Sequence, residues 1–270
     1  MINSTRRRNL ERARKIERHI RPVTLPVGIR FWKKGERIPA EAGKHPENRY
    51  TWCQLVSTVQ FNAADIRQVY LASGSDISCL IAPGVLGFEE WPEEMLDGSF
   101  FGKVHFETNE LALAAINTVP RIPVGAIEAI TVAALEDLGV EPEVIFVAIT
   151  PGQSNKVMDG ALWYKGGPFT VVYSNMCGIC GAATAKAYID RENVNIAFPC
   201  YGARRWGGFK DDELGLSVPI EQFDKWIEGM EKSFRSGHSY PVGHLLRPEP
   251  IEVHHPYTEK PYEELYPYKW

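Results

Sequence analysis

The chain has 270 residues, of which 44% are hydrophobic and 24% are charged, and its formal net charge is −4. This composition is typical of a globular protein with enough apolar side chains for a full core. The slight excess of acidic residues argues against nucleic-acid binding, which needs a basic surface. No apolar run reaches the roughly 20 residues of a transmembrane helix, so we expect no membrane span.

The first 24 residues are basic and lack the apolar segment of a secretory signal peptide. Apolar residues recur at helical spacing between Leu10 and Ile20, which predicts a helix. We expect this helix to pack on the body of the protein, with a membrane-surface helix as the alternative. Without a signal we expect a cytoplasmic protein, in which disulfides are rare, so the five cysteines are free, metal-bound or transiently redox-active.

Hydrophobic patterns predict a series of regular elements along the chain. The first half predicts a strand over residues 25–33, a helix that begins near Trp52, an irregular segment over 73–92 and a helix over 109–119. The pattern over residues 125–138 predicts either a strand or a helix, because their Ala and Leu content suits both.

The second half of the chain alternates between strand and helix patterns. A β-branched apolar run predicts a central buried strand over residues 143–151. Further strands are predicted over 169–175, 194–200 and 214–219, and helices over 154–166, 181–193 and 220–234. This alternation predicts an α/β or α+β fold, a mixed β-sheet flanked by helices, in a single compact domain.

We place this domain at residues 25–236, between the basic helix over residues 1–24 and a C-terminal arm over residues 237–270. The arm is rich in Pro, Tyr and His, which is too apolar for a disordered tail and too rich in Pro for a helix. We expect it to be extended and to pack on the body or on another subunit, so a homo-oligomer is expected.

Three of the cysteines lie close together in the sequence. Cys177 and Cys180 form a Cys-x-x-Cys pair, and both Cys177 and Cys200 follow predicted strands, where sites in open α/β sheets gather. Cys180 begins a predicted helix, whose N-terminus stabilises a thiolate. The pattern predicts metal or cluster ligands, with a redox pair and simple core packing as alternatives.

Two further cysteines, Cys53 and Cys79, lie far upstream. Four thiolates suit a [4Fe–4S] cluster or a structural zinc ion. A zinc knuckle would show two Cys-x-x-Cys pairs, and this chain has one. Scattered cysteines that the fold brings together suit a cluster at least as well as zinc.

Several motifs of the chain follow one another in the order known from a protein family. They are "PVGIRF", "CQLV", "ISCLIAPGVLGF", "EVIFVAITPGQSNKVMDGALWY", "CGAATAKAY" and "VNIAFPCYGARRWGGFKDDELGLSVP". Over roughly residues 25–234 the chain therefore resembles the DUF169 family of bacterial and archaeal proteins, many of them from anaerobes, which has no established general function. The most specific motif is Cys-x-Gly-x-Arg followed by Asp-Asp-Glu, which falls on Cys200, Gly202, Arg204, Asp211, Asp212 and Glu213.

The resemblance implies a set of site residues but no particular reaction. These residues are Cys53, Gln54, Cys79, Cys180 and Cys200. We expect the four cysteines among them to hold a cluster and Gln54 to bind substrate. Cys177 looks like an addition to the family pattern and is treated as a substitute ligand.

Two pairs of polar residues complete the candidate site. Arg204 and Arg205 follow Cys200, and the planar guanidinium suits a carboxylate or a phosphate. We interpret them as an anion clamp in the catalytic site, with a local ion pair to nearby acids as the alternative. Gln153 and Asn155 begin the helix after a central strand and are expected to orient the substrate, with helix capping as the alternative.

The leading hypothesis is a cytoplasmic [4Fe–4S] protein of anaerobic metabolism. It would be an oxidoreductase or a cluster-using lyase that acts on a small anionic substrate and exchanges electrons with a partner. The second hypothesis is a small-molecule-binding or structural protein, with zinc at the same cysteines or no metal at all.

Overall fold

The computed structural model describes residues 3–61, 68–171, 173, 175–234 and 240. Its strands are β1 (Val27–Lys33), β2 (Gln68–Leu71), β3 (Ile127–Ala134), β4 (Val144–Ile149), β5 (Asn195–Ala197) and β6 (Leu214–Pro219). Its α-helices are α1 (Ser4–Ile20), α2 (Trp52–Gln60), α3 (Ala82–Val85), α4 (Glu93–Leu96), α5 (Asn109–Ile116), α6 (Pro151–Leu162), α7 (Lys186–Ile189), α8 (Tyr201–Arg205) and α9 (Phe223–Phe234). Short 3-10 helices are η1 (Ala40–Ala42), η2 (Gly74–Asp76) and η4 (Ile220–Gln222), and η3 (Gly178–Ala185) is a π-helix.

One six-stranded sheet organises the protein, with its strands in the order β2-β3-β1-β4-β6-β5. Every pair of neighbours is antiparallel; in β1, for example, Ile29 lies opposite Val132 of β3 and Val144 of β4. The fold is therefore α+β, one of the two expected classes. The mixture of parallel and antiparallel neighbours that we expected does not occur among the described strands. A parallel pair needs a crossover back to the same end of the sheet, and here each strand meets its neighbours from the opposite end.

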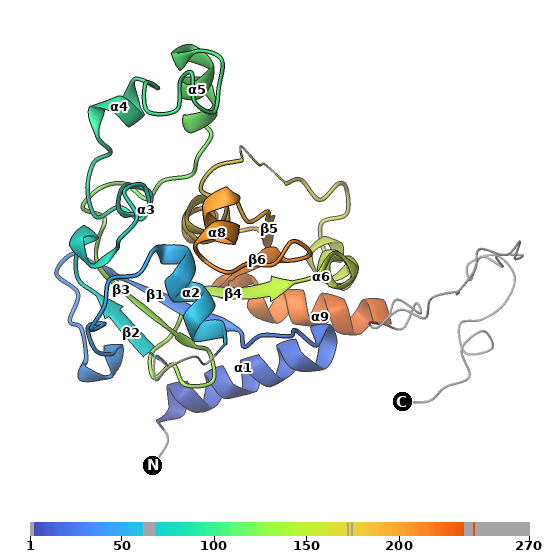
Figure 1. Ribbon diagram of the computed structural model, residues 1–270. Coiled ribbons are helices and arrows are strands. Elements are labelled where there is room, and N and C mark those ends of the chain that lie inside the picture. Colours follow the sequence, from blue (N-terminus) through green and yellow to red (C-terminus); the bar gives the residue numbers. More distant parts are fainter. Residues whose placement is uncertain (1–2, 62–67, 172, 174, 235–239, 241–270) are drawn as a thin grey trace, which may run out of the picture.

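The central strand β4 is buried on both sides, and its residues alternate between two core layers. Val144, Phe146 and Ala148 pack with α2, α3 and η3, whereas Ile145 and Val147 pack with α1, α6 and α9. Figure 1 shows α2 and α8 on one side of the sheet and α1 and α9 on the other. We call these sides the α2 face and the α9 face. Burial of each large aliphatic side chain contributes about 1.5–3 kcal/mol, so this strand anchors both layers.

Most of the predicted elements are confirmed. The predicted strands over 25–33, 143–151, 194–200 and 214–219 are β1, β4, β5 and β6, and the ambiguous segment 125–138 contains β3. The predicted helices are α1, α2, α5, α6, η3 with α7, and α9.

The strand predicted over residues 169–175 is wrong, because none of its described residues lies in a strand. Gly166 and Gly167, just before it, both adopt positive φ and turn the chain away from the sheet. Phe169 and Val171 pack on the core of the α9 face instead. The apolar pattern thus reflects burial without strand pairing.

The N-terminal helix α1 packs on the body of the protein, on the α9 face. Asn3 caps the helix by accepting a hydrogen bond from the Arg6 amide at 2.7 Å. The buried Asn9 side chain donates to the carbonyl oxygens of Leu138 and Val140, both at 2.9 Å. These bonds fix the helix to the turn between β3 and β4.

Two expectations concern features beyond this core. The expected arm over residues 237–270 lies outside the described residues, apart from Tyr240. Within the described part of the chain, no helix is both long and apolar enough to cross a membrane.

We predict that Gly160→Ala destabilises the protein although alanine favours helix. A Cβ at Gly160 would lie 2.6 Å from the Trp226 carbonyl oxygen, because α6 and α9 approach each other closely there. Overpacking of this kind costs about 1–3 kcal/mol, which exceeds the gain in helix propensity of about 0.5–1 kcal/mol. Urea unfolding measures the difference in the free energy of unfolding.

Gly152→Ala is the matched control in the same helix. A Cβ there would have no neighbour closer than 3.8 Å, so we expect no loss of stability. Equal effects of the two substitutions would contradict the close packing of α6 on α9.

Candidate functional site

The five cysteines come from four separate segments of the chain. Cys53 lies in the first turn of α2, and Cys79 lies in the irregular segment between η2 and α3. Cys177 is the N-cap of η3, Cys180 lies in the first turn of η3, and Cys200 is the N-cap of α8. All five pack against the core of the α2 face, Cys177 and Cys180 buried and the other three partly buried. All five cysteines thus lie in the same core layer of the protein.

The π-helix η3 shapes the Cys-x-x-Cys segment. Cys177 adopts a left-handed conformation, with φ of 50° and ψ of 40°, and its carbonyl oxygen accepts hydrogen bonds from the amides of Gly181 at 2.8 Å and Ala182 at 2.9 Å. A left-handed non-glycine residue stores strain, and π-helical turns are rare and concentrate at functional sites. This local geometry makes the segment a candidate for a functional site.

A hydrogen-bonded chain joins η3 to the helix that carries Cys53. The Trp52 indole nitrogen donates to the Thr184 hydroxyl at 3.0 Å, and this hydroxyl donates to the Ile179 carbonyl oxygen at 2.7 Å. The Ser78 amide donates to the Tyr50 carbonyl oxygen at 2.9 Å, which places the Cys79 segment beside the start of α2. Cys53, Cys79 and η3 are thus held in one layer.

Two glycines allow the remaining close approaches. A Cβ at Gly178 would lie 2.1 Å from the Phe198 carbonyl oxygen and 2.8 Å from the Cys200 amide nitrogen. A Cβ at Gly207 would lie 2.6 Å from the Cys53 Cβ atom. Because glycine has no Cβ, the segment around Cys200 packs directly on both η3 and α2.

The thiols influence one another electrostatically, and their pKa values report it. The pKa of Cys53 is raised well above its usual value, first by burial and then by the negative charges that Cys200, Cys79 and Cys177 would carry. The pKa of Cys180 is also raised, first by a hydrogen bond with the Cys177 thiol and then by burial. Without a cation the site therefore favours neutral thiols, and a bound metal would reverse this preference.

The thiols fit a metal by type but do not yet surround one point. Thiolates are soft ligands that suit zinc or an iron–sulfur cluster. Among the described residues, no group of three or more His, Cys, Asp or Glu side chains is already arranged to hold a metal ion.

The two candidate arginines lie on α8, directly after Cys200. The Arg204 guanidinium donates to the Lys210 carbonyl oxygen and lies 3.8 Å from the Asp211 carboxylate. Arg205 is exposed and lies over the Trp206 ring, 5.4 Å from its centroid. Arg204 thus stabilises its own loop, which was the alternative interpretation of this residue. Both arginines lie within five residues of Cys200 in the sequence.

The candidate amides lie on different faces of the sheet. Gln54 follows Cys53 and accepts a hydrogen bond from the Thr51 amide at 2.9 Å, closing the capping box of α2. Gln153 caps α6 and also donates to the carbonyl oxygens of Ile20 and Arg21. Gln153 therefore ties α6 to α1, and it lies away from the cysteines.

Asn155 also belongs to α6, and its side chain is exposed. The structure does not bring it together with the cysteine site, because α6 packs on the α9 face.

Tyr173 lies near the cysteines, and the sequence analysis did not single it out. Its hydroxyl donates to the Asn175 side-chain oxygen at 2.9 Å. Burial raises its pKa first and the negative charge of a Cys200 thiolate raises it further, while Arg204 lowers it. Tyr173 therefore lies close to both Cys200 and Arg204, although the segment that carries it was interpreted only as a strand.

Comparison with known proteins places the chain in a family. The profile of DUF169, described as uncharacterised ArCR proteins, matches residues 15–229. The chain belongs to the DUF169 family. This DUF169 protein is 24% identical over 207 residues to MJ0308, an uncharacterised protein of Methanocaldococcus jannaschii, in an alignment that covers 76% of the chain and 86% of the relative. No solved structure matches this chain significantly.

We predict that Cys53 makes the stability of the metal-free protein fall at alkaline pH. Its pKa is raised in the folded protein, so its contribution is complete below the unfolded pKa of about 8.5 and is lost as the pH rises towards the folded value. Relative to Cys53→Ala, wild-type protein should lose about 1.4 kcal/mol of unfolding free energy per pH unit in that window.

Urea unfolding of reduced, metal-free protein between about pH 7 and pH 10 measures this difference. The loss of packing in Cys53→Ala is independent of pH and only offsets the two curves. A constant difference between wild type and variant over the whole range would contradict the raised pKa.

Proposed function

We propose that this DUF169 protein is an iron–sulfur protein in which Cys53, Cys79, Cys180 and Cys200 hold a [4Fe–4S] cluster. We further propose that it is a cytoplasmic redox enzyme or cluster-using lyase that acts on a small anionic substrate. The observation that carries the proposal is the gathering of five thiols from four chain segments on one face of the sheet.

The number and type of donors support this proposal. Four thiolates are the common ligand set of a [4Fe–4S] cluster. The fifth thiol, Cys177, lies next to Cys180 and raises the pKa of that thiol. Beside a cluster it would serve as a hydrogen-bond donor to a ligand sulfur or as a substitute ligand, and such hydrogen bonds tune the potential of a cluster.

The residues around Cys200 support the redox and substrate parts of the proposal. A bound cluster would supply electron transfer or a Lewis-acidic iron. Arg204 and Arg205 carry positive charge, which offsets the negative charge of a thiolate-ligated centre and suits an anionic substrate. The Tyr173 hydroxyl donates to the Asn175 side chain, and it would have to exchange this bond in order to donate to that substrate.

Exposed aromatic side chains near Cys200 support the expectation of an electron-transfer partner. Phe198 is 42% exposed, Tyr201 is 70% exposed and Trp206 is 58% exposed. Aromatic side chains are enriched at protein interfaces, and these three lie within one short segment that includes Cys200.

The alternative proposal is a binding or structural protein with zinc at these cysteines or with no metal. Two observations favour it. Cys177 and Cys180 are buried in the core, and no three or more potential ligands among the described residues are already arranged around a metal ion. A structural zinc would bind at about one equivalent, and its removal would lower the stability of the protein.

We predict that anaerobically purified protein contains iron and sulfide and that Cys200→Ser abolishes them. About four of each per chain are expected for a [4Fe–4S] cluster, with a brown colour. Cys177→Ser should keep the cluster, because Cys177 lies outside the expected ligand set. Iron and sulfide analysis of the two variants and the wild type makes the measurement.

Both substitutions are nearly isosteric, so we expect the variants to fold. Circular dichroism checks this. Colourless, iron-free wild-type protein from an anaerobic preparation would refute the cluster, and stoichiometric zinc in the same sample would favour the alternative. Retention of full iron by Cys200→Ser would refute the ligand assignment.

A further inference from the structure

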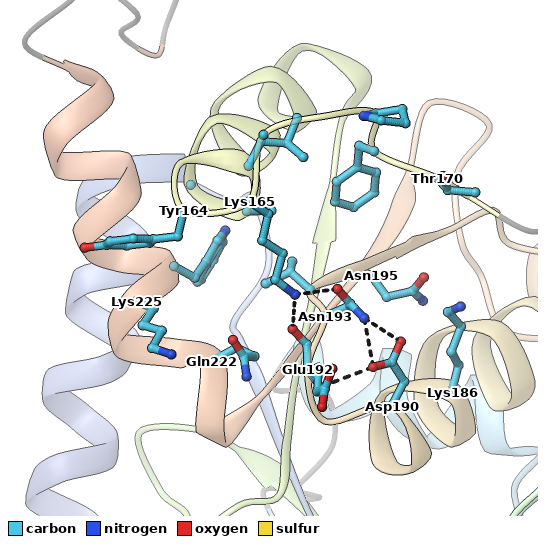
Figure 2. Close-up of a pocket in the computed structure, with 18 residues that line it drawn as sticks. Tyr164, Lys165, Thr170, Lys186, Asp190, Glu192, Asn193, Asn195, Gln222 and Lys225 are labelled. Atoms are coloured by element: carbon cyan, nitrogen blue, oxygen red, sulfur yellow. Dashed lines mark hydrogen bonds between the residues drawn. The ribbon is translucent and has the colours of Figure 1, made fainter.

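A second candidate site lies at the β5 edge of the sheet, and none of the five cysteines lines it. It is a cavity of about 460 Å³ between the end of α6, the segment that follows it, the turn before β5 and the start of α9 (Figure 2). Ligand pockets for small molecules range from about 300 to 1,000 Å³. The cavity is therefore large enough for a small organic molecule.

Positive charge predominates in the lining of this cavity. Lys165, Lys186 and Lys225 line it, against the two acids Asp190 and Glu192. The whole chain, in contrast, has a net charge of −4. A local excess of ammonium groups in an acidic protein points to an anionic ligand.

Two of these lysines are not used by the fold. Within the part of the chain that the structure describes, neither Lys186 nor Lys225 has an acidic partner at ion-pair distance. Figure 2 shows them on opposite sides of the turn that carries Glu192 and Asn193. Two free cations on two walls can each contact a different end of one ligand.

Two other charged groups of the lining, Lys165 and Asp190, have hydrogen-bond partners, whereas the Glu192 residue takes part through its backbone. The Lys165 ammonium donates to the Asn193 side-chain oxygen at 2.6 Å and to the Glu192 carbonyl oxygen. The Asn193 amide donates to both carboxylate oxygens of Asp190 at 3.0 Å. Asp190 is thereby held in the wall of the cavity, and within the described residues it forms no ion pair with Lys186 or Lys225.

Between the lysines the lining includes apolar surface. Leu162, Phe169, Val194 and Trp226 line the cavity. The Trp226 indole nitrogen donates to the Val157 carbonyl oxygen at 3.1 Å, so the ring is fixed by its own hydrogen bond. Apolar walls favour a carbon chain over a bare inorganic ion, which would leave most of the cavity to water.

We propose that this cavity binds a small organic dianion, a short carbon chain with two separated carboxylate or phosphate groups. Lys186 and Lys225 each contact one of these groups, and the apolar walls enclose the chain. None of the five cysteines lines this cavity; they pack against the core of the α2 face.

Isothermal titration calorimetry with two probes, succinate and 3-phosphoglycerate, tests the proposal in phosphate-free buffer. We expect saturable binding of at least one probe, and the comparison tells a dicarboxylate site from a phosphate site. Lys186→Gln and Lys225→Gln should each weaken that binding by about tenfold, since each removes one charge-assisted contact. Lys34→Gln, at an exposed lysine outside the cavity, removes the same charge and should leave the affinity unchanged.

Several results would overturn the proposal. One is the absence of saturable binding of either probe. Another is equal affinity of the wild type and the two cavity variants. A third is an equal loss of affinity in Lys34→Gln, because that result would indicate only a long-range charge effect. Thermal unfolding confirms that the variants are folded. Iron content is measured on the same samples, so a failure here is distinct from a failure of the cluster.

Discussion

The backbone contact between Gly178 and the segment from Phe198 to Cys200 is the constraint on which the cysteine site depends. Any side chain at position 178 would occupy the space of the Phe198 carbonyl oxygen. The contact places the end of β5 against the first turn of η3, so that the segment of Cys200 packs directly on the segment of Cys177 and Cys180. The buried sheet provides a rigid support for this contact, because β4 is enclosed on both sides.

The sequence was sufficient to predict the elements whose side chains enter the core in a regular pattern. The apolar run of β4 and the helical spacing in α1 and α9 report burial directly, so the strand and helices were found. The four-residue edge strand β2 was missed, because a short strand pairs through its backbone and carries little pattern. The apolar segment around Phe169 misled the prediction, since it packs on the core without joining the sheet.

The candidate site was only partly accessible from the sequence. The sequence directly shows which residues are cysteines and how they are spaced. Their placement in one core layer depends on tertiary contacts such as the hydrogen bond from Trp52 to Thr184, which no local pattern encodes. The π-helix, the place of Tyr173 and the lysine-lined cavity all arise from tertiary packing. Helix capping, the alternative role considered for Gln153, is the role that the structure shows. The capping box is a local motif, so the sequence encodes it.

The wide spacing of the thiols along the chain has a consequence for biosynthesis. Cys53 leaves the ribosome long before Cys200, and the two meet through contacts of high sequence separation that form late in folding. An inorganic centre held by both can be inserted only after translation of almost the whole domain. The assembly machinery would then deliver its cargo to a largely folded acceptor, and the thiols would be exposed to oxidants during the interval before delivery.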